Sequence, residues 1–176
     1  MDKFSENIYL VGLMGAGKTT IGRSLAKRLE MRFLDTDKEI ESRTGVTIAT
    51  IFEIEGEEGF RKRESRIVQE TAAQNGCVVA TGGGSVLREE NRVAMRESGF
   101  VVYLNVTPAT LLERTRHDKK RPLLQVADPL SRLTQLFAMR DSLYRTVADI
   151  VVEEERMSAQ GILQHLLKEL SKRWKS

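Results

Sequence analysis

Residues 12–19 are the stretch whose residue types most directly suggest chemistry, and their sequence is GLMGAGKT. This fits the pattern G-x-x-x-x-G-K-[ST], in which the backbone amides of a glycine-rich loop and the N-terminus of the following helix bind phosphate groups. In that pattern Lys18 reaches the β- and γ-phosphates of a nucleotide, and the hydroxyl group of Thr19 binds Mg²⁺. An apolar run at residues 8–11 and a helical apolar spacing at 20–29 flank the loop. This strand–loop–helix context favours a phosphate site over a chance glycine-rich turn.

Two carboxylates, Asp35 and Asp37, lie at the end of a second short apolar run, residues 32–35. If this strand ends near the glycine-rich loop, the carboxylates could serve a Mg²⁺ ion and the hydroxyl group that accepts a phosphate. A simpler alternative is that Asp37 only caps the next helix. The two roles do not exclude each other.

Arg61 and Glu64 are three residues apart in a helical pattern, so their side chains can pair on one helix face. The alternative is an exposed ion pair, which would contribute little to stability. Gly82, Gly83 and Gly84 follow a third strand and would let a ligand approach the backbone closely, or would form a plain turn.

Two further arginines lie in the segments that follow, and the first of them is a candidate for binding phosphate. Arg121 lies in a long loop at residues 118–128, from which an arginine could close over phosphates and stabilise charge in a transition state. Arg140 lies in the next helical pattern. For Arg140 the alternative is an arginine on the helix surface, paired with Asp141 or solvated.

These residues need a scaffold, and the chain predicts one by alternating strands with helices. Strands are expected at residues 8–11, 32–35, 77–81, 100–104 and 150–152, and helices at 20–29, 37–43, 47–55, around 60–71, and at 89–98, 107–117, 129–147 and from 158 onward. Five short apolar strands separated by helices predict an α/β fold with a five-stranded parallel sheet covered on both faces. Ligands then collect at the carboxyl ends of the strands.

Composition narrows the class of protein. The chain has 176 residues, which fits one domain over residues 1–176, and a net charge of only +3. A nucleic-acid-binding protein would show a larger basic excess or a known motif, so no nucleic-acid partner is expected. A charged N-terminus, no apolar run of membrane-spanning length and a single cysteine, Cys77, predict a cytoplasmic protein without membrane attachment or disulfides.

The ordered set of motifs resembles bacterial shikimate kinase from residue 8 to about residue 170. The matching segments are residues 12–19, 35–37, 60–61 with Glu64, 80–85, 121–124, 143–144 and 148–149. The resemblance implies ATP-dependent phosphorylation of the 3-hydroxyl group of shikimate to shikimate 3-phosphate, on the route to chorismate and the aromatic amino acids. It also implies a P-loop kinase fold like that of nucleoside monophosphate kinases, with a mobile lid at about residues 115–127.

The resemblance assigns roles residue by residue. Shikimate would be contacted by Asp37, Arg61, Gly83 and Arg140, with both arginines on its carboxylate and with Glu64 orienting Arg61. The phosphates of ATP would be held by Gly15, Ala16, Gly17, Lys18, Thr19 and Thr20, and by Arg121 from the lid. One Mg²⁺ ion would be bound by Thr19 directly and by Asp35 through water. Arg114 and residues 156–158, among them Met157, would flank the adenine. The catalytic residues would be Lys18, Asp37 and Arg121.

The chain departs from the usual family pattern at two places. Ser142 stands where proline is common, from which a slightly looser turn beside Arg140 is expected, and residues 153–157 match weakly. Rival hypotheses are a kinase of the same fold that acts on gluconate or a nucleoside monophosphate, and a non-catalytic module that binds a nucleotide or nucleic acid. The shikimate kinase hypothesis is preferred over both. It implies ATP and shikimate as partners, and the protein is expected to be a monomer.

Overall fold

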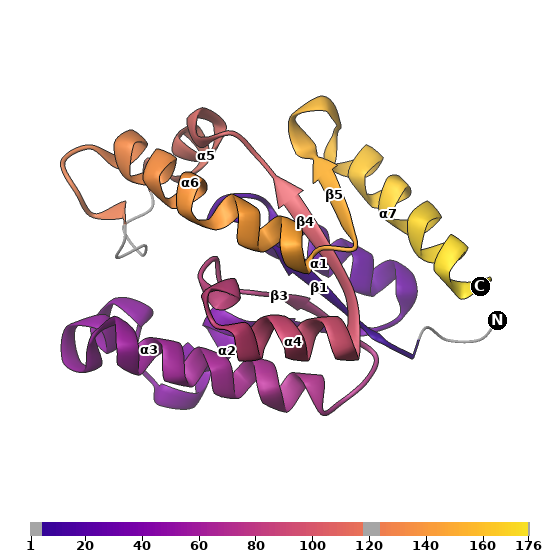
Figure 1. The fold of residues 1–176 in the computed structure, drawn as a ribbon, viewed down its shortest axis with the longest axis horizontal. Coiled ribbons are helices and arrows are strands. Elements are labelled where there is room, and N and C mark those ends of the chain that lie inside the picture. The colour runs from indigo at the N-terminus through magenta and orange to yellow at the C-terminus, as the bar shows by residue number, and fades with distance from the viewer. Residues whose placement is uncertain (1–4, 118–123, 176) are drawn as a thin grey trace.

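The computed structural model describes residues 5–117 and 124–175. One or more helices separate each strand from the next along the chain, as Figure 1 shows. The elements are β1 (Asn7–Val11), α1 (Lys18–Leu29), β2 (Arg32–Asp35), α2 (Thr36–Thr44), α3 (Ile48–Ala72), β3 (Cys77–Ala80), η1 (Ser85–Leu87), α4 (Glu89–Ser98), β4 (Gly99–Asn105), α5 (Pro108–Thr115), α6 (Pro129–Val147), β5 (Ile150–Glu153), η3 (Glu154–Arg156) and α7 (Ala159–Trp174).

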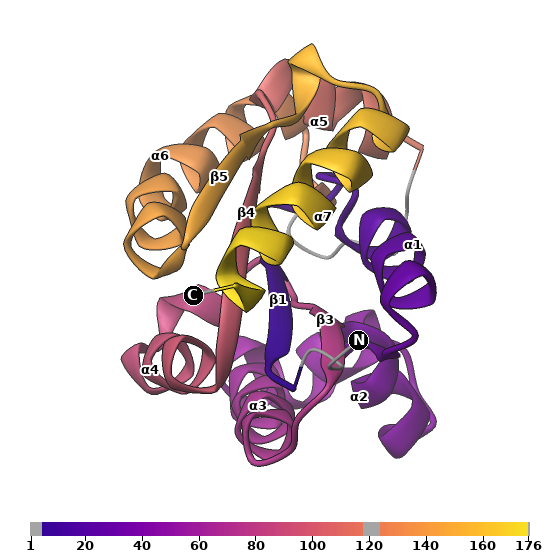
Figure 2. The same ribbon diagram turned by 90° about the vertical axis from the view of Figure 1, so that its right-hand side faces the viewer.

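The five strands form one parallel sheet in the order β2-β3-β1-β4-β5. Helices α1 and α7 cover one face of this sheet, and α4 and α6 cover the other (Figures 1 and 2). The predicted fold class, a five-stranded parallel sheet between helices, is therefore confirmed. Because all strands run the same way, the segments that follow β1, β2 and β3 leave the same edge of the sheet.

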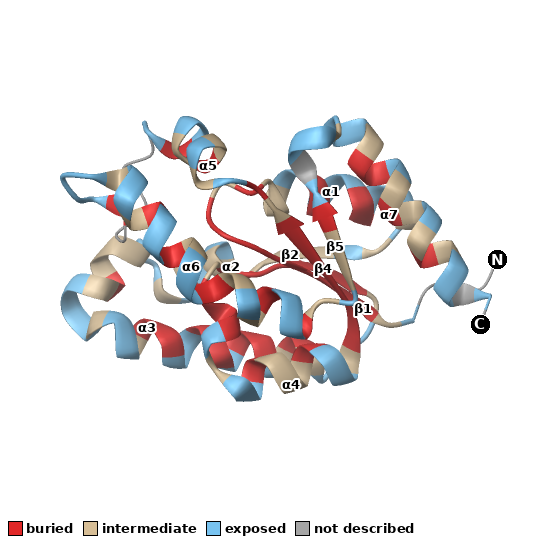
Figure 3. Ribbon diagram, turned by 45° about the horizontal axis from the view of Figure 1, so that its top comes forward, coloured by how far each residue is buried: buried red, intermediate tan, exposed pale blue. Residues whose placement is uncertain are grey.

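The core lies along the central strands. Every residue of β1 and β3 is buried, and so is β4 from Gly99 to Leu104 (Figure 3). Strands buried on both faces take apolar side chains at nearly every position, which explains why the sequence shows them as continuous apolar runs. No helix in the described part of the chain is both long and apolar enough to cross a membrane.

Three local features differ from the sequence predictions. The N-cap of α2 is Asp35, whose carboxylate accepts a hydrogen bond from the Lys38 amide at 3.2 Å, so the alternative in which Asp37 caps this helix is wrong. The helices expected on either side of residue 56 follow each other directly and form the two parts of α3, with a kink at Gly56. The short helix η1 after the glycine run was not predicted.

A buried asparagine joins β1 to its neighbours at the edge of the sheet opposite the carboxyl ends. The Asn7 amide donates hydrogen bonds to the carbonyl oxygens of Thr71 at 3.1 Å and Gln74 at 2.9 Å, and its oxygen accepts one from the Cys77 amide at 3.0 Å. Asn7 thereby fixes the end of α3 and the start of β3 against β1. The loops that follow β1 and β3 take their relative position from this register.

We expect Asn7→Ala to lower the free energy of unfolding by about 3 kcal/mol, because it leaves several buried backbone groups without a partner. Urea unfolding measures this change. The matched control is Gln69→Ala. The exposed Gln69 side chain also donates a hydrogen bond to a backbone carbonyl, that of Glu90, at 3.2 Å. Removing the Gln69 side chain should change the free energy of unfolding by less than about 0.5 kcal/mol. Equal losses from the two substitutions would contradict the structural role of Asn7.

Candidate active site

A cleft of about 590 Å³ opens at the carboxyl ends of the strands. Twelve of the fourteen predicted site residues line it: Gly15, Ala16, Gly17, Lys18, Thr19, Thr20, Asp35, Asp37, Arg61, Gly83, Arg114 and Arg140. Met157 is not among the lining residues, and Arg121 lies outside the described residues. The topology thus gathers side chains that are up to 125 positions apart in the sequence, from Gly15 to Arg140, into one site.

The glycine-rich loop joins β1 to α1 at one side of the cleft. Gly17 is the N-cap of α1 and has φ 93°, a left-handed conformation that favours glycine. The Lys18 ammonium group folds back over the loop and donates hydrogen bonds to the carbonyl oxygens of Gly12 and Leu13, the latter at 3.0 Å. The N-terminus of α1, with its partial positive charge, therefore faces the cleft beside a lysine cation, which suits a phosphate chain.

Thr19 and Asp35 provide oxygen atoms next to this phosphate site. The Thr19 hydroxyl donates a hydrogen bond to the Asp35 carboxylate at 2.7 Å, although the two residues come from different elements. A hydroxyl and one carboxylate are hard oxygen donors, and Mg²⁺ commonly takes one or two such protein groups together with substrate phosphates. The described residues contain no group of three His, Cys, Asp or Glu side chains able to hold a metal. The donor set therefore fits an ion that is shared with a nucleotide.

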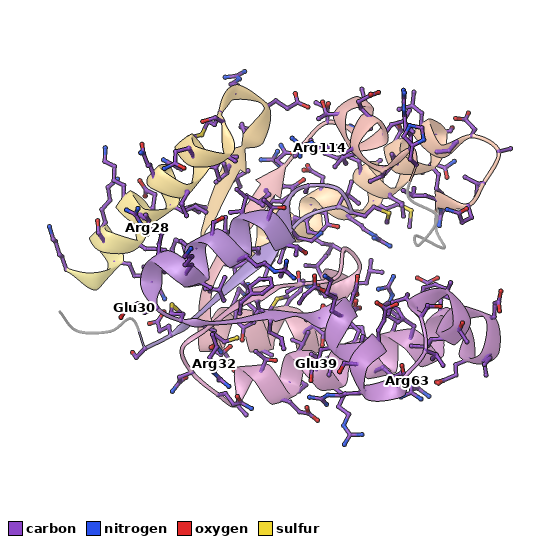
Figure 4. The ribbon with its side chains drawn as sticks, turned by 180° about the vertical axis from the view of Figure 1, so that it is seen from behind. Arg28, Glu30, Arg32, Glu39, Arg63 and Arg114 are labelled. Carbon is purple, nitrogen blue, oxygen red and sulfur yellow. The ribbon has the colours of Figure 1, made fainter. Side chains whose placement is uncertain are left out.

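Arg61 and Glu64 form a buried ion pair at the other side of the cleft. An Arg61 Nη1 donates to Glu64 Oε1 at 2.9 Å, and only 7% of Arg61 and none of Glu64 is exposed. The alternative of an exposed surface pair is therefore wrong. Such an exposed pair does occur elsewhere on α3, between Arg63 and Glu55 at 2.7 Å; Arg63 is labelled in Figure 4.

Burial governs the electrostatics of this pair. It raises the pKa of Glu64 to about 7, against the attraction of the Arg61 cation and with reinforcement from the negative charge of Asp37. For Arg61, burial disfavours the cation, but the charges and hydrogen bonds of Glu64 and Glu57 outweigh this and raise its pKa. Arg61 thus stays charged, while Glu64 titrates near neutrality.

The glycine run packs directly against these charged side chains. A Cβ atom added at Gly84 would lie 2.4 Å from the Arg61 guanidinium, and one added at Gly82 would lie 2.5 Å from Glu64 Oε2 and 2.9 Å from Asp37 Oδ1. Any other residue at these positions would displace the charged groups. The run is therefore more than a plain turn, because its missing side chains make room for the charge cluster.

The Arg140 side chain, on α6, lies beside the same glycine run. It is 3% exposed, and among the described residues its Nε and Nη1 atoms have no hydrogen-bond acceptor. A Cβ atom added at Gly83 would lie 3.6 Å from Arg140 Nη1. The alternative of a surface arginine paired with Asp141 is wrong, since Asp141 instead bonds Arg145 at 3.0 Å.

The expected looser turn beside Arg140 is also wrong. Ser142, at the position where proline is common, lies within the continuous helix α6 and is exposed. Arg140 is therefore held by a regular helix, and its side chain direction follows from the packing of that helix on the sheet.

The predicted adenine side is only partly assembled. The Arg114 guanidinium donates a hydrogen bond to the Gly15 carbonyl at 3.2 Å, so Arg114 lies beside the glycine-rich loop (Figure 4). Met157 is partly buried against the core. Ala159, at the start of α7, lines the cleft and was not predicted.

Apolar lining residues on α3 were also missed. Ile48 and Phe52 line the cleft together with Phe60, whose ring centroid lies 5.0 Å from that of Phe52. Ile48 and Phe52 are four residues apart and therefore lie on one helix face. This spacing is the sequence signal that could have identified them as lining residues. Together the geometry provides a glycine-rich loop at a helix N-terminus, a hydroxyl–carboxylate pair beside it and two buried guanidinium groups. This arrangement would suit the transfer of phosphate to a carboxylated acceptor.

Comparisons with known proteins agree with this geometry. A family model described as "Shikimate kinase" matches residues 14–171. Shikimate kinase from Dechloromonas aromatica (strain RCB) is 60% identical over 167 residues, which cover 95% of this chain and 91% of that protein. Shikimate kinase from Neisseria meningitidis serogroup C (strain 053442) is 54% identical over 172 residues, covering 98% and 100%.

Solved structures give the same family and a wider fold group. Shikimate kinase from Acinetobacter baumannii in complex with shikimate has a TM-score of 0.94 and 46% identity, and the match covers 97% of this chain and 96% of that one. A gluconokinase from Sinorhizobium meliloti 1021 has a TM-score of 0.60 at 16% identity, covering 97% and 94%, which shows likeness of fold alone.

The raised pKa of Glu64 leads to a pH prediction for the ligand-free protein. Because the folded protein binds this proton more tightly than the unfolded chain does, the free energy of unfolding should fall as pH rises from about 4.5 to 7 and should level off above that range. Glu64→Gln cannot titrate, so its stability curve lacks this component. Urea unfolding of both proteins between pH 4.5 and 8 tests the prediction, and parallel curves would contradict it.

Proposed function

The chain belongs to the shikimate kinase family, and we propose that its cleft holds ATP, a Mg²⁺ ion and shikimate through the residues placed there by the fold. Family membership gives the activity, the transfer of phosphate from ATP to the 3-hydroxyl group of shikimate, with a divalent metal. The assignment of individual residues and of Mg²⁺ as the metal is our proposal. The observation that carries it is the pair of buried guanidinium groups, Arg61 and Arg140, around Gly83 in a cleft that also contains the phosphate-binding loop.

On the nucleotide side, the amides of residues 15–20 and the Lys18 ammonium group bind the phosphates of ATP. Thr19 and Asp35 hold Mg²⁺, Thr19 directly and Asp35 through water, which their 2.7 Å hydrogen bond supports. When bound, the ion neutralises charge on the phosphates. Arg114, beside Gly15, is the better supported adenine neighbour. We retain Met157 as a proposal, although it does not line the cleft.

On the acceptor side, Arg61 and Arg140 bind the carboxylate of shikimate. Arg61 Nε and Arg140 Nε and Nη1 are buried donors that have no hydrogen-bond partner among the described residues. Buried donors of this kind are costly unless a ligand satisfies them, and guanidinium groups match a carboxylate in charge and shape. Glu64 keeps Arg61 in place, and Gly83 lets the substrate approach the backbone.

The reaction is an in-line transfer. The 3-hydroxyl oxygen of shikimate bonds to the γ-phosphorus, and the bond from that phosphorus to the β–γ bridging oxygen breaks, so that ADP leaves. Such transition states are loose, and positioning and charge stabilisation therefore dominate catalysis. Lys18 stabilises the transferred group. Asp37 aligns the hydroxyl group and accepts its proton, although a loose transition state does not require a strong base.

The remaining expectations stay proposals. Arg121 approaches the phosphates from a lid at about residues 115–127, of which 118–123 lie outside the described residues, and closure of this lid excludes water. We propose that residues 1–176 work as one domain, as a cytoplasmic monomer without a nucleic-acid partner. The low net charge and the buried free thiol of Cys77 support this view.

Coupled ADP release with several acceptors tests the proposed function. With ATP and Mg²⁺, we expect release that depends on shikimate and stays at the acceptor-free level with gluconate or AMP. Release with gluconate instead would keep the phosphate site and overturn the acceptor assignment. No release with any acceptor, from folded protein that binds ATP, would support the non-catalytic alternative.

Arg140→Ala should raise the KM for shikimate by at least about tenfold, because it removes a buried charged partner of the carboxylate. The KM for ATP should change by less than about twofold, since Arg140 does not contact the phosphate loop in this assignment. Arg145→Ala is the matched control on the same helix, where Arg145 is exposed and paired with Asp141. Equal increases in both KM values after Arg140→Ala would show that Arg140 is structural.

A further inference from the structure

Tyr144 lies one helical turn after Arg140 on α6, so both side chains are on the same face of that helix. No part of Tyr144 is exposed, and its hydroxyl group donates a hydrogen bond to the Gly83 carbonyl oxygen at 2.5 Å. Tyr144 does not line the cleft, whereas Arg140 and Gly83 both do. It therefore lies behind the wall of the cleft and joins two residues that form it.

A second hydrogen bond holds the same turn of α6. The Tyr103 hydroxyl on β4 donates to the Asp141 carboxylate at 2.8 Å, and the rings of Tyr103 and Tyr144 pack with their centroids 4.9 Å apart. The helical turn that carries Arg140 is thus attached to the glycine run by Tyr144 and to the sheet by Tyr103.

The glycine run is fixed from its other side as well. The Gly82 amide donates to the hydroxyl of the buried Thr36 at 2.9 Å, and the Ser85 hydroxyl donates to the Gly82 carbonyl at 2.8 Å. Because Thr36 stands between Asp35 and Asp37, the run is attached to the segment that carries both carboxylates. The hydrogen bond from Tyr144 completes a connection from that segment to Arg140.

We propose that Tyr144 is a positioning residue for the acceptor, since its hydroxyl group sets the distance between the Arg140 guanidinium and Gly83, with Tyr103 holding the same turn of the helix. Burial raises the pKa of the Tyr144 hydroxyl, so it stays protonated and keeps donating its hydrogen bond to Gly83. This inference rests on the proposed role of Arg140 in binding the carboxylate of shikimate.

The expected size of the effect follows from the loss of one buried hydrogen bond. Tyr144→Phe removes the hydroxyl and keeps the ring, and we expect it to raise the KM for shikimate about 3- to 10-fold. The KM for ATP should change less than about twofold, because the phosphate loop keeps its own hydrogen bonds. Tyr103→Phe should also raise the KM for shikimate, but by a smaller factor than Tyr144→Phe does.

Tyr9→Phe is the matched control. Tyr9 is also fully buried, and its hydroxyl is 2.6 Å from the Ser98 hydroxyl, but it belongs to the region around Asn7 at the opposite edge of the sheet. It loses a buried hydrogen bond of the same kind and should leave both KM values within about twofold of the wild-type values. Thermal unfolding of each variant sets an assay temperature at which all of them are folded.

The wild-type assay comes first and separates the two claims. If the wild-type protein does not use shikimate, the proposed function fails, and this inference fails with it. If the wild type uses shikimate, two results for Tyr144→Phe would overturn only the positioning role. One is an unchanged KM for shikimate, and the other is an equal increase in the KM values for shikimate and ATP. Should Tyr144→Phe fail to fold, Tyr103→Phe decides, and an unchanged KM for shikimate in that variant also overturns the proposal.

Discussion

The acceptor side of the cleft depends on keeping charged side chains out of water. Arg61, Glu64 and Arg140 are almost entirely buried, and Asp37 is close to them. Removing ions from water costs several kcal/mol each, which mutual attraction only partly offsets. The raised pKa of Glu64 shows that the offset is incomplete. We infer that the cluster is kept for binding an anion, because both arginines line the cleft and have buried guanidinium donors without a hydrogen-bond partner among the described residues.

The strand order brings this cluster to the phosphate site. Since β1 lies next to β3, and β3 next to β2, the glycine-rich loop, the glycine run and the Asp35–Asp37 segment leave adjacent strands at one edge of the sheet. A Cβ atom added at Gly83 would lie 3.5 Å from the Gly12 carbonyl oxygen and from the Met14 amide nitrogen. The glycine-rich loop and the glycine run therefore touch at Gly83. In the proposed assignment this contact brings the ATP side and the acceptor side of the cleft together.

Sequence reasoning succeeded where the signal was local. The phosphate loop, the five strands and the pairing of Arg61 with Glu64 all follow from spacing within one or two elements. It failed where tertiary packing decides: the burial of Arg140 depends on how α6 lies over the glycine run, and the link from Tyr144 to Gly83 joins residues 61 positions apart. The cap of α2 could be Asp35 or Asp37 by residue type alone. The roles taken from family resemblance await experiment, although most of those residues line one cleft.

The central claim is that two buried arginines recognise the carboxylate of the acceptor. Isothermal titration of the unmodified protein with shikimate and with its methyl ester tests this most directly, because the ester keeps the ring and hydroxyl groups, loses the negative charge and gains one methyl group. The account predicts that shikimate binds at least about tenfold more tightly than the ester. Equal affinities would show that the buried guanidinium groups do not bind the carboxylate and would contradict the account.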